Sequence, residues 1–88
     1  MAAAAKRADR LPLFFALLRD NLATNVRAAR QAAGLSQREL GALSNLARDY
    51  VRRIEAGETN ASLETICALA EHLGKHPLEL LGSPTPES

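Results

Sequence analysis

Apolar residues recur along the chain at the three- and four-residue spacing of helices, in runs that glycines separate. Leu22, Val26 and Ala29 form one such run before Gly34, and residues at this spacing share one helical face. Each run ends at a glycine, the residue that most easily supplies the left-handed conformation of a helix stop. These glycines are Gly34, Gly57, Gly74 and Gly82. Four stops predict at least four helices.

Polar residues mark where three of these helices begin. Ser36 with Glu39 three residues later is the pattern of a capping box, and Ser62 can cap a later helix. The expected apolar face of that later helix comprises Leu63, Ile66, Leu69, Ala70 and Leu73. Pro77 after His76 favours a last short helix, with proline at its first position.

The helix that begins after Ser36 contains a glycine between its apolar positions. Leu40 and Leu43 are its expected inward positions. Gly41 costs a helix about 1 kcal/mol relative to alanine, so we expect another backbone to pass close to it. The helix should break near Asn45, because asparagine tolerates the positive φ of a sharp turn.

A second short helix is predicted from about residue 48 to residue 56. Val51 and Ile54 face inward, so the polar residues of this helix must point outward together, and these are Arg48, Asp49, Arg52 and Arg53. Two short helices joined by a tight turn make a helix-turn-helix. The major groove of DNA, about 12 Å wide, accepts such a helix. We therefore expect the arginines to meet guanine edges and phosphates.

The N-terminal segment carries two apolar stripes. One comprises Leu11, Phe14, Phe15, Leu18 and Leu22, and the other Leu13 and Leu17. One stripe can pack on the domain, and the other then marks a partner surface, so residues 1–20 are a candidate dimerisation arm; folding of both stripes onto the core is the alternative. Residues 12–34 could form one long helix or two, interrupted near Asp20-Asn21. Residues 1–8 and the flexible tail 83–88 are expected to be frayed.

Size and composition favour one all-α domain. The chain has 88 residues, 47% of them apolar but only three aromatic, which favours helices packed on helices. Its single cysteine, Cys67, lies in an apolar run, which indicates a core position, a reducing compartment and a cytoplasmic protein. The apolar stretch 11–18 is too short for a membrane span, which needs about 20 residues, and has no signal-peptide cleavage site.

Charge is segregated although the net charge is only +1. Residues 27–53 carry six arginines against two acidic residues, whereas residues 55–88 carry six glutamates against one lysine. A nearly neutral chain can therefore present one strongly positive face to a polyanion. A solvated charged surface is the alternative interpretation.

Three stretches carry a resemblance to a known family: "NVRAARQAAGLSQREL", "YVRRIEAGETNASLETICALAEHLG" and "HPLELLG". In order and spacing they resemble the lambda-repressor-like, Cro/CI-type (XRE) helix-turn-helix proteins. The resemblance implies an all-α, five-helix domain at residues 21–82, here with an additional N-terminal helical segment. It also implies a transcriptional regulator, expected to be a repressor, that binds double-stranded DNA at an inverted-repeat operator as a homodimer.

The resemblance also implies which residues meet DNA: Gln37, Arg38, Arg48, Asp49, Tyr50, Arg52, Arg53, Thr59 and Asn60. Gln37 would contact a phosphate and support the recognition helix, Arg48, Asp49 and Arg53 would read bases, and Arg52 would reach a base or a phosphate. Thr59 and Asn60 would lie along the DNA backbone, although a turn role fits them nearly as well. Arg30 and Glu55 match a pair that ties the first helix to the end of the recognition helix.

Three residues depart from the family pattern. Ala47 stands at a position where the family often has a capping Ser or Thr, which removes a cap of about 1 kcal/mol. Asn45 replaces the common turn glycine, and Ala61 a common proline. None of the three breaks the motif.

Two other classes of function fit the sequence less well. Nothing indicates an enzyme or a cofactor, because no triad, phosphate loop or paired-carboxylate cleft is present. Cys67, His72 and His76 do not suggest a metal site, since Gly74 should end the helix between the histidines. A module that keeps the fold without DNA binding, or an antitoxin that covers a toxin partner and regulates its own operon, remains the alternative.

Overall fold

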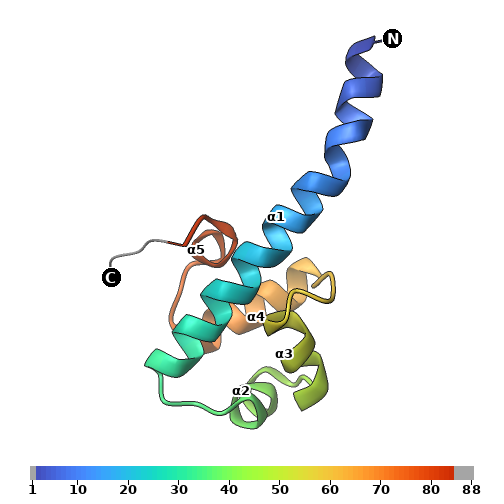
Figure 1. Cartoon of the computed structure of the whole chain (residues 1–88). Coiled ribbons are helices and arrows are strands. Elements are labelled where there is room, and N and C mark those ends of the chain that lie inside the picture. The colour runs from blue at the N-terminus through green and yellow to red at the C-terminus, as the bar shows by residue number, and fades with distance from the viewer. Residues whose placement is uncertain (1, 85–88) are drawn as a thin grey trace.

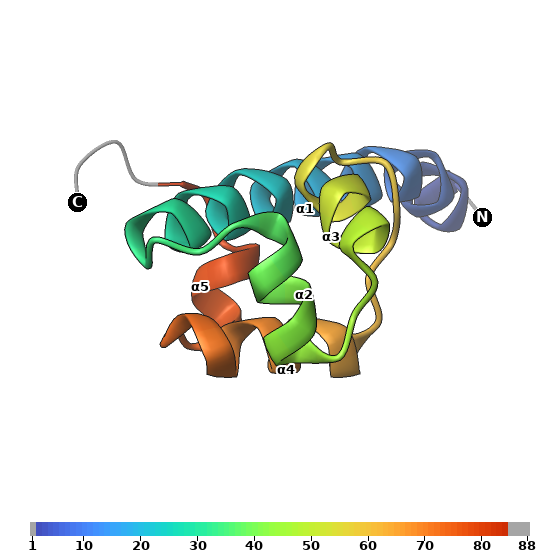
Figure 2. The ribbon, with the colours of Figure 1, turned by 90° about the horizontal axis from the view of Figure 1, so that it is seen from below.

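The computed structural model describes residues 2–84, and their side chains from residue 11 onward. Within this range the chain forms five helices and no strand: α1 (Ala2–Ala32), α2 (Gln37–Ser44), α3 (Arg48–Glu55), α4 (Leu63–Leu73) and α5 (Pro77–Leu81). The second half of α1 lies across one side of the domain, α3 and α5 flank it, and α4 runs behind (Figures 1 and 2). The all-α, five-helix prediction is confirmed.

The chain forms α1 as one uninterrupted helix, which decides between the two alternatives for the N-terminal segment. Asn21 is buried, and its side-chain amide donates to the carbonyl of Leu81 at 3.0 Å. The amide of Asn25, one turn later, donates to the carbonyls of Leu80 at 2.9 Å and Gly82 at 2.8 Å. The asparagine that suggested a break is therefore one of two amides that hold α5 against α1.

The two chain ends differ from the frayed segments we expected. The helix begins at Ala2, so the expectation is wrong for residues 2–8, while Met1 lies outside the described residues. Ser83 and Pro84 follow α5 without regular structure, and the rest of the expected tail, residues 85–88, also lies outside the described part. None of the described helices is both long and apolar enough to cross a bilayer.

Every helix contributes to the core. The fully buried large side chains are those of Leu40, Ile54, Leu69, Leu80, Val26 and Val51. The inward positions expected on α1, on α3 and for most of α4 are confirmed, because Leu22, Ala29, Ile66, Ala70 and Leu73 are buried as well. Burial of these apolar faces, at about 25 cal/mol for each Å² removed from water, is the main force that holds the helices together.

Three expected core positions are wrong. Leu43 is 51% exposed, because α2 buries Leu40, Gly41 and Ser44 instead. Leu63 is 77% exposed in the first turn of α4, and Cys67 is exposed on the flank of the face that Ile66 and Ala70 bury.

The predicted helix ends are mostly confirmed. Ser36 and Glu39 form the capping box, and the hydroxyl of Ser62 accepts from the N–H of Thr65. Three of the four glycines have the positive φ of a left-handed stop; Gly82 does not, because its φ of −77° is extended backbone. Beyond the prediction, Nδ1 of His76 accepts from the N–H of Leu78 and caps α5.

Apart from Leu22, neither apolar stripe of the N-terminal segment packs on the domain. Residues 2–20, the arm, project beyond the other helices (Figures 1 and 2). All six large apolar side chains of residues 11–18 are exposed, whereas Leu22, at the junction with the domain, is buried. Both the expectation that one stripe packs and the alternative that both fold back are therefore wrong.

Candidate nucleic-acid interface

The turn between α2 and α3 depends on two special backbone positions. Asn45 has φ 59° and ψ 43°, the left-handed conformation that was expected there. The N–H of Leu46 then donates to the carbonyl of Gly41 at 2.7 Å. A Cβ on Gly41 would lie 2.6 Å from the carbonyl oxygen of Leu46. Gly41 is thus required by the close approach of the chain leaving the turn, which confirms the prediction.

One side of α3 is fixed in the domain while the other faces solvent. Val51, Ile54 and Glu55 are buried, and α3 packs on both α1 and α2. The four polar residues predicted to point outward are all exposed, namely Arg48, Asp49, Arg52 and Arg53. Ala47, at the N-cap, offers no side-chain hydrogen bond to the first turn, as its sequence position implied. The first turn of α3 therefore keeps backbone N–H groups unused by a cap.

Glu55 is the anchor of α3, and its side chain is fully buried. Arg30 on α1 donates to it twice, from Nε at 2.6 Å and from Nη2 at 3.0 Å. Gln37, the first residue of α2, donates from Nε2 to the same carboxylate at 3.1 Å. Arg30 also donates to the carbonyl of Leu35 at 2.9 Å. One carboxylate therefore ties together α1, the start of α2 and the end of α3, and the pairing of Arg30 with Glu55 is confirmed.

The ion pair between Arg30 and Glu55 contributes more to the orientation of α3 than to the stability of the fold. Hydrogen bonding to Glu55 raises the pKa of the Arg30 guanidinium above its ordinary value, against the desolvation that burial imposes. Burying two charges costs much of what their attraction returns, whereas removing one partner leaves the other charge buried and unpaired. The pair thus fixes the orientation of α3 more than it adds to the free energy of unfolding.

The charges on the exposed side of α3 are not equivalent. Arg52 donates from Nε to Oδ1 of Asp49 at 3.1 Å, and its Nη2 lies 3.8 Å from Oε1 of Glu58. Within residues 11–84, no side-chain hydrogen bond or ion pair engages Arg48 or Arg53. Two arginines are therefore ready to bind an anion, while Asp49 already holds the guanidinium of Arg52.

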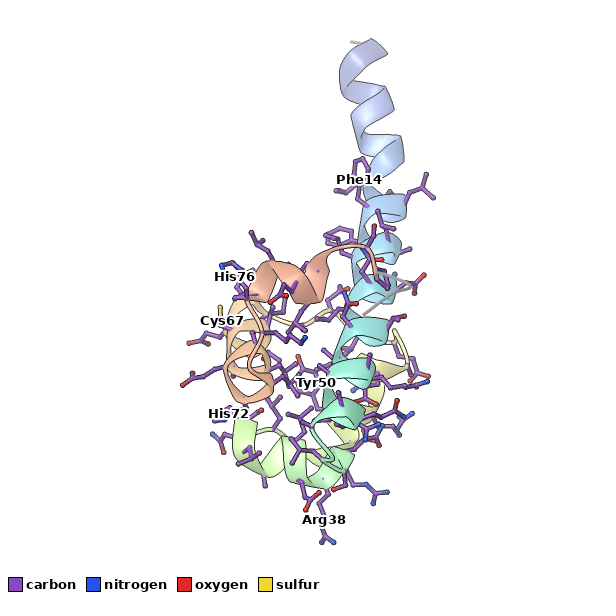
Figure 3. All side chains as sticks on the ribbon, turned by 90° about the vertical axis from the view of Figure 1, so that its left-hand side faces the viewer. Phe14, Arg38, Tyr50, Cys67, His72 and His76 are labelled. Atoms are coloured by element: carbon purple, nitrogen blue, oxygen red, sulfur yellow. The ribbon has the colours of Figure 1, made fainter. Side chains whose placement is uncertain are left out.

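The other predicted DNA-contacting residues surround α3 at different degrees of exposure. Arg38 is exposed and projects from α2 away from the core (Figure 3). Gln37 is half-buried, and its amide donates to Glu55, which links the start of α2 to the end of α3. Tyr50 is half-buried and packs against the core (Figure 3). In the loop after α3, Thr59 is half-buried and Asn60 exposed.

Sequence reasoning missed some of the residues that position this surface. Arg27 donates from Nη2 to the carbonyl of Glu55 at 3.3 Å, a second link from α1 to the end of α3. Its position one turn before Arg30 was the available signal.

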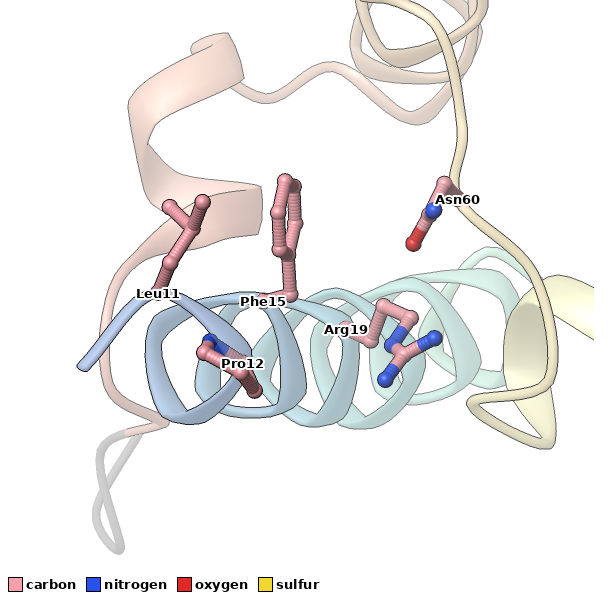
Figure 4. A pocket seen from close by; sticks show the side chains of 5 residues that line it. All are labelled: Leu11, Pro12, Phe15, Arg19 and Asn60. Atoms are coloured by element: carbon pink, nitrogen blue, oxygen red, sulfur yellow. The ribbon is translucent and has the colours of Figure 1, made fainter. Parts of the chain in front are cut away.

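Asn60 and Arg19 line a hollow between the loop after α3 and the arm (Figure 4). No group of three metal-ligating side chains occurs in the described part of the chain, and Gly74 ends α4 between the two histidines.

Comparison with known proteins decides the family. A family model described as helix-turn-helix matches residues 26–80, well over half of the chain. The chain belongs to this XRE-type helix-turn-helix family of transcriptional regulators. The family is not one of enzymes.

Among curated relatives, the chain is 45% identical over 47 residues to an uncharacterized HTH-type transcriptional regulator of Haemophilus influenzae. That match covers 53% of this chain and 48% of the relative, so the chain spans about half the length of that protein. The chain is also 38% identical over 64 residues to the control protein C.SmaI of Serratia marcescens, covering 73% of the chain and 76% of C.SmaI.

Solved structures show the same fold. The hypothetical transcription factor NHTF from Neisseria superposes with a TM-score of 0.75 at 38% identity, over 77% of this chain and 76% of NHTF. The restriction-modification controller protein C.AhdI from Aeromonas hydrophila superposes with a TM-score of 0.68 at 42% identity, over 70% of this chain and 94% of C.AhdI. In both cases the shared part leaves out roughly a quarter or more of this chain.

Proposed function

We propose that this protein binds double-stranded DNA sequence-specifically as a homodimer on an inverted-repeat operator, and that it represses transcription in the cytoplasm. The first turn of α3 enters the major groove. Arg48 and Arg53 donate bidentately to guanine, whereas Arg52, held by Asp49, contacts a phosphate or a neighbouring base. Gln37, Arg38, Thr59 and Asn60 contact the DNA backbone, and Tyr50, half-buried on α3, is the last member of the contacting set.

One observation carries the proposal: α3 is fixed on one side and bare on the other. Val51, Ile54 and Glu55 hold the helix in the domain, while four charged residues on the opposite side are exposed. Arg48 and Arg53 are exposed and free of ion pairs within residues 11–84. The backbone of a helix held in this way is already ordered, so binding a polyanion costs mainly the rotamer freedom of its exposed arginine side chains.

Selection from a random library of double-stranded DNA tests this function. We expect an enriched inverted repeat whose half-sites lie about one turn of B-DNA apart, roughly 34 Å. Binding should weaken steeply as salt rises, because each neutralised phosphate releases counterions. A selection at low ionic strength that enriches no sequence would contradict the proposal.

The effect of the protein on transcription is tested separately from its binding to DNA. A reporter gene behind the selected operator should fall in expression when the protein is present; a rise would make the protein an activator. The relative C.AhdI is a restriction-modification controller protein, so genes next to this one are the first targets to examine. Co-purification of a small basic protein, together with failure to enrich any DNA, would support the antitoxin-type alternative.

A further inference from the structure

The apolar face that α1 buries in the domain continues, uncovered, along the arm. Leu22 and Val26 are 3% and 0% exposed, but one turn earlier Leu18 is already 43% exposed. The uncovered side chains and their exposures are Leu11 53%, Leu13 69%, Phe14 53%, Phe15 49%, Leu17 53% and Leu18 43%. A face that forms the core in one half of a helix therefore has no cover in the other half.

The uncovered area is large enough for a stable interface between two copies. With roughly 200 Å² for a fully exposed large apolar side chain, these exposed fractions amount to about 600 Å² per chain. Two arms in contact would then bury up to about 1,200 Å², the lower end of the range for stable specific interfaces, before the arm ends contribute. A second copy supplies the same self-complementary surface, as a two-fold interface requires.

The six uncovered side chains lie on one side of the arm, and this is the side that a second copy would contact. At 3.6 residues per turn the six positions fall within an arc of about 200°, centred close to Phe14. Asn21 and Asn25, which hold α5, lie on the same side of the helix. Phe14 projects toward the side of α4 and α5 (Figure 3), and Leu11 and Phe15 line the adjacent hollow opposite Asn60 (Figure 4).

Charge selects the orientation of the pair. The arm carries Lys6, Arg7 and Arg10 against Asp9 near its free end, whereas the one charged residue of α5 is Glu79. A parallel pair would place the two basic ends together. If the arms instead cross antiparallel at Phe14, Lys6 and Arg7 fall opposite residues 21–22 of the second copy. There Asn21 and Asn25 hold α5, which carries Glu79.

We infer that the arm is the dimerisation surface of this protein, and that it binds the arm of a second copy in antiparallel orientation, centred on Phe14. The basic end of each arm reaches the α5 side of the other domain, where Glu79 lies. This inference names the surface for the homodimer proposed above. Its test measures assembly without DNA, so it can fail while DNA binding by α3 stands.

Sedimentation of the full chain at micromolar concentration is the first test, with F14E as the disrupting variant. A glutamate at the centre of the interface should raise the dimer dissociation constant by about a hundredfold or more, because two buried charges would face each other. A16E is the matched control, since Ala16 lies on the opposite side of the helix, and it should leave the constant within about threefold. Circular dichroism checks that both variants keep their helices.

Charge reversal and cross-linking test the orientation. Lys6→Glu with Arg7→Glu should weaken the dimer at low salt and remove its salt dependence. In a Cys67→Ala background, F14C should form disulfide-linked dimers on mild oxidation, whereas R10C should not. Residue 10 of one arm lies next to residue 10 of the other only when the two arms are parallel. Cross-linking of both variants would overturn the antiparallel arrangement.

Three further outcomes would overturn the inference. One is a chain that stays monomeric up to about 100 μM. Another is a dimer that F14E leaves intact, which would place the interface elsewhere. The last is a monomer whose arm binds phospholipid vesicles, which would make a membrane surface the occupant.

Discussion

The Glu55 anchor gives a sharp prediction about stability. Glu55→Gln keeps the shape of the side chain but removes the charge that accepts two hydrogen bonds from Arg30 and one from Gln37. The guanidinium of Arg30 has a side chain only 13% exposed, so it would remain largely buried without its counter-charge. The substitution therefore isolates the cost of an unpaired charge from that of a cavity.

The magnitude follows from the burial of the pair. Breaking a buried pair by removing one partner costs about 3–5 kcal/mol, and glutamine keeps one acceptor oxygen, so we expect a loss near the lower end, about 3 kcal/mol in the free energy of unfolding. For a domain of this size that loss lowers Tm by roughly 12–24 °C. Thermal and urea unfolding followed by circular dichroism measure both quantities.

Glu58→Gln is the matched control for this prediction. It makes the same chemical change at a side chain that is 55% exposed and 3.8 Å from Arg52. Exposed ion pairs contribute little, so its effect should stay below about 0.5 kcal/mol. A loss below about 1 kcal/mol for Glu55→Gln, or equal losses for the two variants, would refute the view that Glu55 is the buried anchor of α3.

Substitutions at three other positions test the turn and Arg48. Gly41→Ala should destabilise the fold by about 1–3 kcal/mol, because a Cβ would lie 2.6 Å from the carbonyl oxygen of Leu46; the same change in an open helix stabilises, so the sign of the urea-unfolding result decides. Asn45→Ala should cost about 1 kcal/mol and Asn45→Gly almost nothing, since φ is 59°; equal losses on thermal unfolding would contradict the backbone explanation. Arg48→Ala should weaken binding to the selected operator by about 1–3 kcal/mol in a fluorescence titration, whereas Lys75→Ala, between α4 and α5, should change it little; equal effects would remove Arg48 from the interface.

Local chemistry in the sequence was enough to predict most of the domain. The capping box at Ser36, the left-handed Asn45 and the close approach at Gly41 each depend on a few neighbouring residues, and all three are confirmed. The pairing of Arg30 with Glu55, 25 residues apart, came from the family resemblance and is also confirmed.

The wrong predictions concern which apolar side chains are covered by other helices, because a local sequence pattern does not contain that information. Leu43, Leu63 and Cys67 lie at or beside helical positions that face inward, yet no other helix covers them. The same limit applies to the arm, where apolar periodicity predicted packing but the cover of the domain ends at Asn21. The sequence left open whether the helix breaks near Asn21, since the partner of Asn21, the carbonyl of Leu81, lies 60 residues away.

The central claim is that α3 reads bases through its unpaired arginines, and Arg53→Ala tests it most directly. Binding of the wild type and of this variant is measured against every single-base change in the selected operator, at fixed salt. We expect the variant to lose about 1–3 kcal/mol and to become indifferent at one position in each half-site. A uniform loss over all sequences would show a phosphate contact, and no loss at all would contradict the account of α3 as the recognition helix.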